Sequence, residues 1–221
     1  MKRSIRPLLA VLFGVLALGL IVIAIRGGIR AVRPEPMEMP DEVYDALNSR
    51  QFSLDGVTYT LPLPVQELMA TGWEGYAGAP RDLKRAANPL EPGHIRNAWL
   101  QNDSTAENVL EISFLEVYFF NFAEEALPLS EVHIVQISPH RGWPDVGWIP
   151  DTEIVFPGNV VIGSTRNEVL AALGTPDERR GDAHYIYSTE HAEMRIIFSN
   201  RLVLRMYLHY LGGNLGAEHN R

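Results

Sequence analysis

Apolar residues at helical and alternating spacing predict two similar regions of helix and strand along this chain. Residues 158–176 show the clearest pattern, in which a short strand, a helix and a stop follow one another. Thr165 and Glu168 have the spacing of a capping box, in which each side chain accepts a hydrogen bond from the other residue's backbone N–H. The helix then carries an apolar stripe formed by Val169, Leu170, Ala172 and Leu173. Gly174 can adopt the left-handed conformation that ends a helix, and Pro176 prevents its continuation.

Three strands are predicted after this helix, over residues 185–188, 194–199 and 202–210, with Asn200-Arg201 as a two-residue turn. The last strand alternates over its whole length. One face carries Leu202, Leu204, Met206, Leu208 and Tyr210, and the other carries Val203, Arg205, Tyr207 and His209. We expect one face to pack against the helix and the other to meet water or a partner. Residues 153–210 therefore predict a module of one helix and an antiparallel meander.

A similar spacing of glycines around a predicted helix occurs earlier in the chain. Two glycine pairs have the same separation of 16 residues: Gly56 with Gly72, and Gly158 with Gly174. Pro64 begins the earlier helix, because proline is favoured at the first helical position. A hairpin is predicted at Asp55-Gly56, and strands are predicted over 95–101, 109–121 and 132–138. Residues 52–138 therefore predict a first copy of the module.

An uncharged apolar stretch over residues 7–25 predicts a transmembrane helix. At about 1.5 Å per residue it nearly matches a hydrocarbon core about 30 Å thick. A cleaved signal peptide is the alternative, but its apolar region is shorter and small residues follow it at a cleavage site. Here Ile25 leads directly into Arg26-Gly27-Gly28. Residues 1–33 are therefore expected to be a cytoplasmic tail and an uncleaved anchor, with the rest of the chain outside the cytoplasm.

The remaining segments connect these parts. Residues 34–51 are predicted to be a linker, in which three prolines make residues 33–40 an extended spacer and residues 41–50 form either a short helix or an ordered turn. Residues 139–152 form a connector between the modules, and residues 211–221 form a flexible tail. The predicted fold class is α+β: a transmembrane helix followed by two tandem modules, each with a helix and an antiparallel meander.

The distribution of charge argues against a nucleic-acid partner. Six of the 19 Lys and Arg residues lie in the first 33 positions, and all 27 acidic residues follow. Residues 34–221 therefore hold 13 basic against 27 acidic residues, a net charge of −14, which repels nucleic acid and anionic lipid headgroups. The chain has no cysteine, which excludes disulfides, thiolate metal sites, cysteine nucleophiles and lipid attachment at cysteine.

Motifs for catalysis and cofactor binding are missing from the sequence. Two histidine pairs, His133 with His140 and His184 with His191, are each seven residues apart, a spacing that does not bring two imidazoles to one metal ion. Ser164 lies at a helix start without the Gly-x-Ser-x-Gly motif of a nucleophile elbow. No phosphate-binding or dinucleotide-binding glycine motif occurs. We therefore expect no enzyme activity, no cofactor and no metal.

The best candidates for an interaction surface are aromatic and arginine residues. Arg205, Tyr207 and His209 share one face of the last strand, and Arg195 is expected to join them from the neighbouring strand. Arg, Tyr and Trp dominate the energetics of protein interfaces. Trp143 and Trp148 in the connector either fill the space between the modules or anchor a partner.

A motif in the second module resembles the SmpA/OmlA (BamE-like) domain. It comprises Gly163, Thr165, Glu168, Val169, Leu173, Gly174 and Pro176, followed by a three-stranded meander. The tandem arrangement is similar to the β-lactamase inhibitor protein fold and to membrane-anchored proteins of Gram-positive bacteria that carry these repeats. The resemblance implies protein binding rather than catalysis. BamE-like proteins usually have an acylated cysteine and one module, so the resemblance does not extend to outer-membrane assembly.

These features predict a membrane-anchored, extracytoplasmic protein-binding or scaffolding module of the bacterial envelope. Its partner would be another envelope or membrane protein. The first alternative is a sensor for a small ligand or cell-wall fragment, and the more distant alternative is an envelope hydrolase.

Overall fold

The computed structural model describes residues 36–76, 79, 83–84, 89–102, 113–139 and 153–212. The chain divides into two compact units, 1–36 and 37–221. Only Pro36 of the first unit is described, and the fold below is that of the second. Its helices are α2 (Asp41–Asn48), α3 (Val65–Met69) and α4 (Arg166–Leu173), with the 3-10 turns η2 (Leu129–Glu131) and η4 (Pro157–Asn159).

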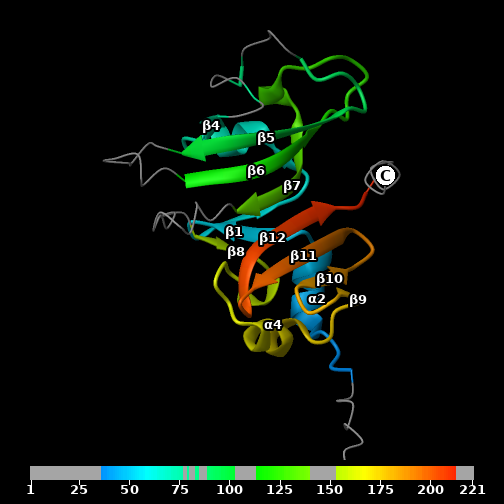
Figure 1. The fold of residues 1–221 in the computed structure, drawn as a ribbon. Helices are drawn as coiled ribbons and strands as arrows, with labels where there is room; N and C mark the ends of the chain where they lie inside the picture. The colour runs from blue at the N-terminus through cyan, green and yellow to red at the C-terminus, as the bar shows by residue number, and fades with distance from the viewer. Residues whose placement is uncertain are drawn as a thin grey trace, which may run out of the picture. The chain divides into compact units, whose positions relative to one another are not determined.

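A nine-stranded sheet contains strands from both predicted modules (Figure 1). Its strands from one edge to the other are β4 (Glu74–Gly75), β5 (Ile95–Asn102), β6 (Ser113–Phe120), β7 (His133–Pro139), β12 (Leu202–Tyr210), β11 (Ala192–Ser199), β10 (His184–Ser188) and β9 (Glu178–Arg180). The short β3 (Leu63–Pro64) also pairs with β7. The two halves join where β7 and β12 run antiparallel, with Ile137 opposite Leu208 and Gln136 opposite His209.

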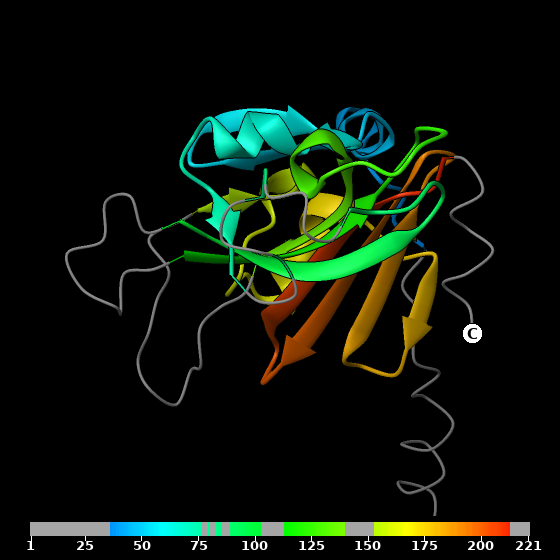
Figure 2. The ribbon, with the colours of Figure 1, turned by 90° about the horizontal axis from the view of Figure 1, so that it is seen from above.

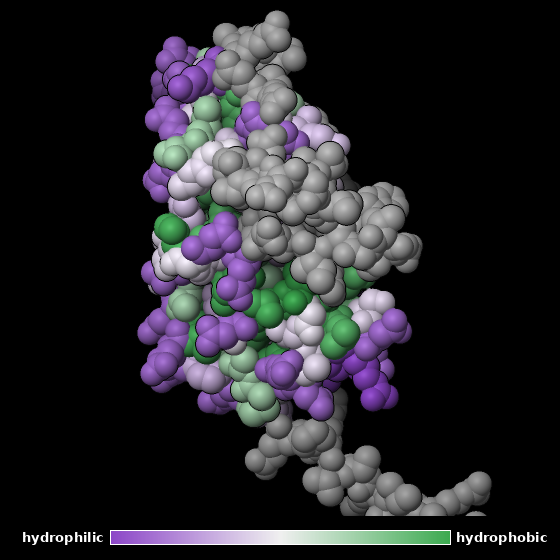
Figure 3. Space-filling view, turned by 90° about the vertical axis from the view of Figure 1, so that its left-hand side faces the viewer, coloured by the Kyte–Doolittle hydropathy of each residue, from purple (hydrophilic) through white to green (hydrophobic). Residues whose placement is uncertain are grey.

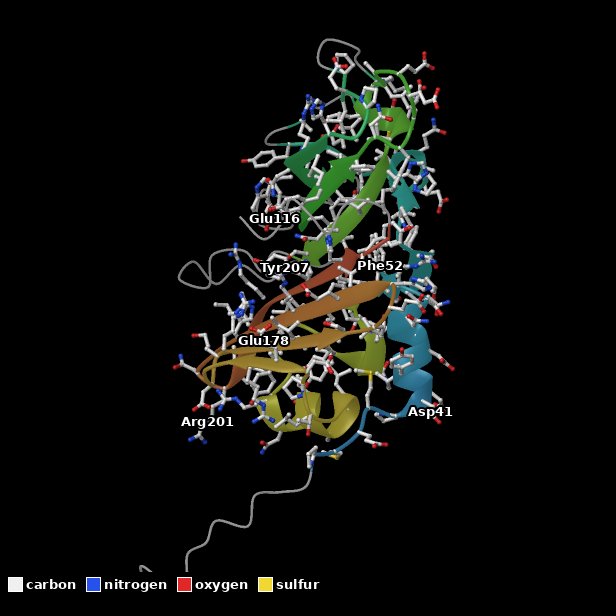
Figure 4. The ribbon with its side chains drawn as sticks, turned by 90° about the vertical axis from the view of Figure 1, so that its right-hand side faces the viewer. Asp41, Phe52, Glu116, Glu178, Arg201 and Tyr207 are labelled. Atoms are coloured by element: carbon white, nitrogen blue, oxygen red, sulfur yellow. The ribbon has the colours of Figure 1, made fainter. Side chains whose placement is uncertain are left out.

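A second, smaller sheet also combines the two halves of the chain. Its strands are β2 (Val57–Thr60), β1 (Gln51–Leu54) and β8 (Ile154–Val155), in that order. The small sheet and α2 lie on one side of the large sheet (Figure 2). In Figure 4, Phe52 and Asp41 lie on this side, whereas Glu116, Tyr207 and Glu178 lie on the other. We call the face of the large sheet with Glu116, Tyr207 and Glu178 the outer face, and the opposite one the inner face.

One hydrophobic core fills the space between the two layers. Phe52 of the small sheet stacks on Tyr59 at 5.7 Å between ring centroids and meets Phe156 edge-on at 6.5 Å. The inner face of the large sheet contributes fully buried side chains from both halves: Val117, Phe119, Ile137, Met194, Ile196, Met206 and Leu208. Burial of these inner-face side chains stabilises both halves together. On the outside of the molecule, Figure 3 shows hydrophobic side chains in the lower middle of one side, between hydrophilic margins.

The predicted α+β fold with two tandem helix-plus-meander modules is wrong. The described residues form twelve strands and only three short α-helices, so this part of the chain is mostly β. The physical reason is the pairing of β7 with β12. Each is the last strand of its half, and as a free edge each would expose a row of backbone N–H and C=O groups. Pairing satisfies these groups and merges the two meanders into one sheet.

The predicted transmembrane helix also requires correction. Among the described residues, no helix combines the length and the apolar character needed to cross a membrane, since the longest have eight residues. The stretch over 7–25 lies outside the described residues. The extracytoplasmic location stays a prediction.

The predicted capping box of α4 and the end of the helix at Gly174 are confirmed, whereas the short strand predicted before the helix is absent: residues 158–159 lie in η4, and Val160 forms an isolated bridge with Phe156. The Thr165 hydroxyl accepts a hydrogen bond from the Glu168 backbone N–H at 3.2 Å, and the Glu168 carboxylate accepts one from the Thr165 N–H at 2.6 Å. Gly174 ends the helix at φ 73° and ψ −154°, a conformation essentially confined to glycine. The chain before α2 packs over this end, because the Thr175 N–H donates to the Met37 carbonyl at 2.6 Å. Both predicted hairpin turns are present, at 55–56 and 200–201.

The predicted strict alternation of the last strand is interrupted by a β-bulge. Arg205 lies opposite Ile197, whereas Val203 lies opposite Phe198, so Leu204 is an extra residue on β12. The bulge changes which face each residue meets. Val203 is therefore buried with Met206 on the inner face, while Leu202 is 42% exposed.

Candidate functional site

The outer face brings together the four interaction candidates that the structure describes. Tyr207 lies directly opposite Arg195 of β11, and His209 lies opposite Glu193. Arg205 is on the same face of β12 as both Tyr207 and His209, because two-residue spacing on a strand keeps side chains on one side. Trp143 and Trp148 lie outside the described residues.

The exposure of these side chains differs along β12. Arg195, Arg205 and Tyr207 are half-buried, so each side chain offers part of its surface to a partner. His209 is only 6% exposed, and its opposite neighbour Gln136 on β7 is only 9% exposed. The reachable part of β12 is therefore its middle, around Tyr207.

Ion pairs neutralise two of the arginines on this face. Arg195 is paired with Glu193 of its own strand, and Arg180 is paired with Glu178 at 2.7 Å. Each of these pairs lies two residues apart on one strand, on the same side of the sheet. Arg205 makes no side-chain ion pair or hydrogen bond within the part of the chain that the structure describes. Its guanidinium is the cation on β12 that can donate hydrogen bonds to a partner's carboxylate.

The surroundings of Tyr207 keep its hydroxyl neutral. Burial is the largest cause that raises the pKa of Tyr207, and the charge of Glu116 raises it further, while Arg205 and Arg195 oppose this effect. A neutral phenol can both donate and accept a hydrogen bond. Tyr207 therefore offers a partner an apolar ring with a polar tip.

His184 lies on the same face of β10, opposite Ile197 of β11 and Arg180 of β9. Burial lowers the pKa of His184, and the nearby charges of Arg180 and Arg195 lower it further. The Nε2 atom is buried without a hydrogen-bond partner. The imidazole is therefore held in its neutral form at pH 7.

The sequence did not predict that residues from the first half of the chain also lie on the outer face, next to Tyr207 and His209. Glu116 of β6 acts electrostatically on Tyr207, and its carboxylate accepts a hydrogen bond from the Asn97 side-chain amide at 2.9 Å. Gln136 of β7 lies opposite His209. The alternation of β6 and β7 shows which residues share a face, but no local pattern shows that β7 pairs with β12.

The residues considered for catalysis have structural partners or are dispersed. The Ser164 hydroxyl accepts a hydrogen bond from the Val161 N–H at 3.1 Å, which closes the turn before α4, whereas Thr165 caps the helix itself. Among the described residues, no group of three or more His, Asp or Glu side chains is placed to hold a metal ion.

Comparison of the chain with protein-family models, with curated proteins and with solved structures gives no match. The resemblance of residues 163–176 to the BamE-like domain therefore stays a prediction.

Proposed function

We propose that the chain is a protein-binding module without catalytic activity, which holds another protein of the bacterial envelope against its outer face. The observation that carries the proposal is the arrangement of Arg205 and Tyr207. They lie two residues apart on one face of β12, near the middle of a nine-stranded sheet, and both are half-buried. Arginine and tyrosine at the centre of a surface are the residue types that most often contribute large binding energies.

The distribution of charge supports this part of the sheet as the contact region. Residues 34–152 hold six basic and 19 acidic residues, whereas residues 153–210 hold six basic and seven acidic residues. The second half is therefore close to neutral and repels an acidic partner much less. We propose a partner that presents a carboxylate to Arg205, because guanidinium and carboxylate groups form strong charge-assisted hydrogen bonds.

The stiffness of the sheet also supports the proposal. Arg195, Arg205 and Tyr207 are on two long strands, β11 and β12, that pair over their whole length. Side chains on such strands need little reordering when a partner binds, so less conformational entropy is lost.

Capture of the partner from cells tests this proposal. The tagged full-length chain is cross-linked in cells, and the co-purifying proteins are quantified by mass spectrometry. We expect one stoichiometric envelope protein, lost with Arg205→Glu combined with Tyr207→Ala and retained with Arg201→Glu, which makes the same charge change at the exposed turn before β12. Equal capture by all three chains would exclude this face.

A further inference from the structure

The small sheet has an unpaired edge, which is separate from the outer face of the large sheet. β2 is the edge strand of the small sheet, paired on one side with β1. Val57 and Tyr59 lie opposite Leu54 and Phe52, next to the two-residue turn. In such a hairpin these are the pairs that exchange backbone hydrogen bonds, so the N–H and C=O groups of Thr58 and Thr60 point away from β1.

This edge lacks the charged side chains that protect many edge strands. Val57 is 51% exposed, Thr58 and Thr60 are exposed, and none of the four residues of β2 is charged. By contrast, the β9 edge of the large sheet consists of Glu178, Arg179 and Arg180, all exposed. Charged or very short edges resist pairing with another chain, whereas an uncharged β-branched edge favours it.

We propose that β2 pairs with β2 of a second copy of this chain, antiparallel, about a two-fold axis at Tyr59. In this register Thr58 lies opposite Thr60 of the partner copy, and Thr60 lies opposite Thr58. The outward backbone groups of both residues then form two hydrogen bonds at each of the two pairs.

The self-complementarity of this segment identifies a second copy as the occupant. Threonine stands on both sides of Tyr59, so the same Thr–Thr pair forms twice, and such cross-strand pairs stabilise a sheet. The nearest acidic residue on the strand side, Asp55, lies four positions from the axis. The two Val57 residues, at which the strands begin, would be about 14 Å apart at about 3.4 Å per residue, and Asp55 lies beyond them in the turn, so the two carboxylates are separated by more than a Debye length of about 8 Å.

The size of the contact determines the kind of dimer. Four residues on each strand bury less than the roughly 1,200 Å² that stable interfaces usually require. We therefore expect a weak dimer in reversible exchange with the monomer, separate from the binding of a partner on the outer face.

Single-cysteine variants test the register directly, because the chain has no cysteine of its own. The full-length chain is prepared as Thr58→Cys with an affinity tag and as Thr60→Cys without one. In the proposed dimer the Cα atoms of these two substituted positions are about 5.5 Å apart, within disulfide range. In a dimer of two Thr58→Cys chains the substituted positions would be about 8 Å apart, beyond that range.

The mixture should therefore form a disulfide-linked heterodimer under mild oxidation, several-fold faster than either variant alone forms a homodimer. Gln51→Cys is the control, since this exposed residue lies one strand inside the edge. Sedimentation of wild-type protein should show concentration-dependent dimerisation that Thr60→Pro weakens. The proposal is overturned if the mixture cross-links no faster than the single variants, or if either variant alone cross-links fastest.

Discussion

Leu208 of β12 lies opposite Ile137 of β7, and both side chains are fully buried. This pair is where the strands of the first half of the chain meet those of the second. Because the core on the inner face is continuous across it, the two halves should unfold together rather than as separate modules.

Truncation of Leu208 tests this cooperativity. Leu208→Ala removes a fully buried side chain and should lower the free energy of unfolding by about 2–5 kcal/mol. Tryptophan fluorescence and far-UV circular dichroism should still give one coincident urea transition. Leu202→Ala on the same strand is the control, because Leu202 is 42% exposed and its loss should cost less than about 0.5 kcal/mol. Two separated transitions in the wild-type chain would contradict a shared core.

Two glycines with positive φ should respond differently to a methyl group. Gly174 has φ 73°, and a Cβ there would contact the Met37 carbonyl oxygen and lie 2.7 Å from that of Glu38. Gly163 has φ 91°, but a Cβ there would meet no atom within 4 Å. Gly163→Ala should cost about 1–2 kcal/mol from backbone strain alone. Gly174→Ala should cost clearly more in the same urea titration, and equal losses would argue against the close packing of residues 37–38 on the end of α4.

The capping box of α4 predicts a pH-dependent contribution to stability. Hydrogen bonds from the Thr165 backbone and side chain lower the pKa of Glu168. The carboxylate therefore stabilises the folded chain above its unfolded pKa, and this contribution is lost as pH falls through the folded pKa. Thr165→Ala should cost about 1 kcal/mol at pH 7. It should also reduce the stability lost between pH 7 and pH 3, compared with Asn167→Ala as a control on the same helix.

The local structure was more predictable than the pairing of distant strands. Thr165, Glu168 and Gly174 interact within one short segment, so their spacing alone identified the helix and its ends. The hairpins at 55–56 and 200–201 depend equally on local turn geometry.

The joined sheet could not be predicted in the same way. Nothing in the spacing of β7 or β12 shows that Gln136 lies opposite His209, because two strands of suitable pattern can pair wherever the chain brings them together. The bulge at Leu204 could not be predicted either, because it depends on the register between β12 and β11. Leu202 and Leu204 fit an alternating pattern, but the register with β11 decides that Val203 faces the core instead.

The outer face predicts an unusual histidine titration. Burial and the charges of Arg180 and Arg195 place the pKa of His184 below 6.5. Because the unfolded chain binds this proton more readily, stability should fall as pH drops from about 6.5 toward the folded pKa. NMR titration should show the low pKa, and Arg180→Gln should raise it while Arg201→Gln leaves it unchanged. A His184 pKa of 6.5 or above would argue against this environment.

Photo-cross-linking in living cells tests the proposed function most directly. A benzophenone amino acid replaces Tyr207 on the outer face, or Tyr44 on α2, which is also a tyrosine and is 42% exposed. We expect one defined adduct with another envelope protein from position 207, none from position 44, and loss of the adduct when Arg205→Glu is added. No adduct at position 207, or the same adducts from both positions, would contradict the assignment of the outer face as a protein-binding site.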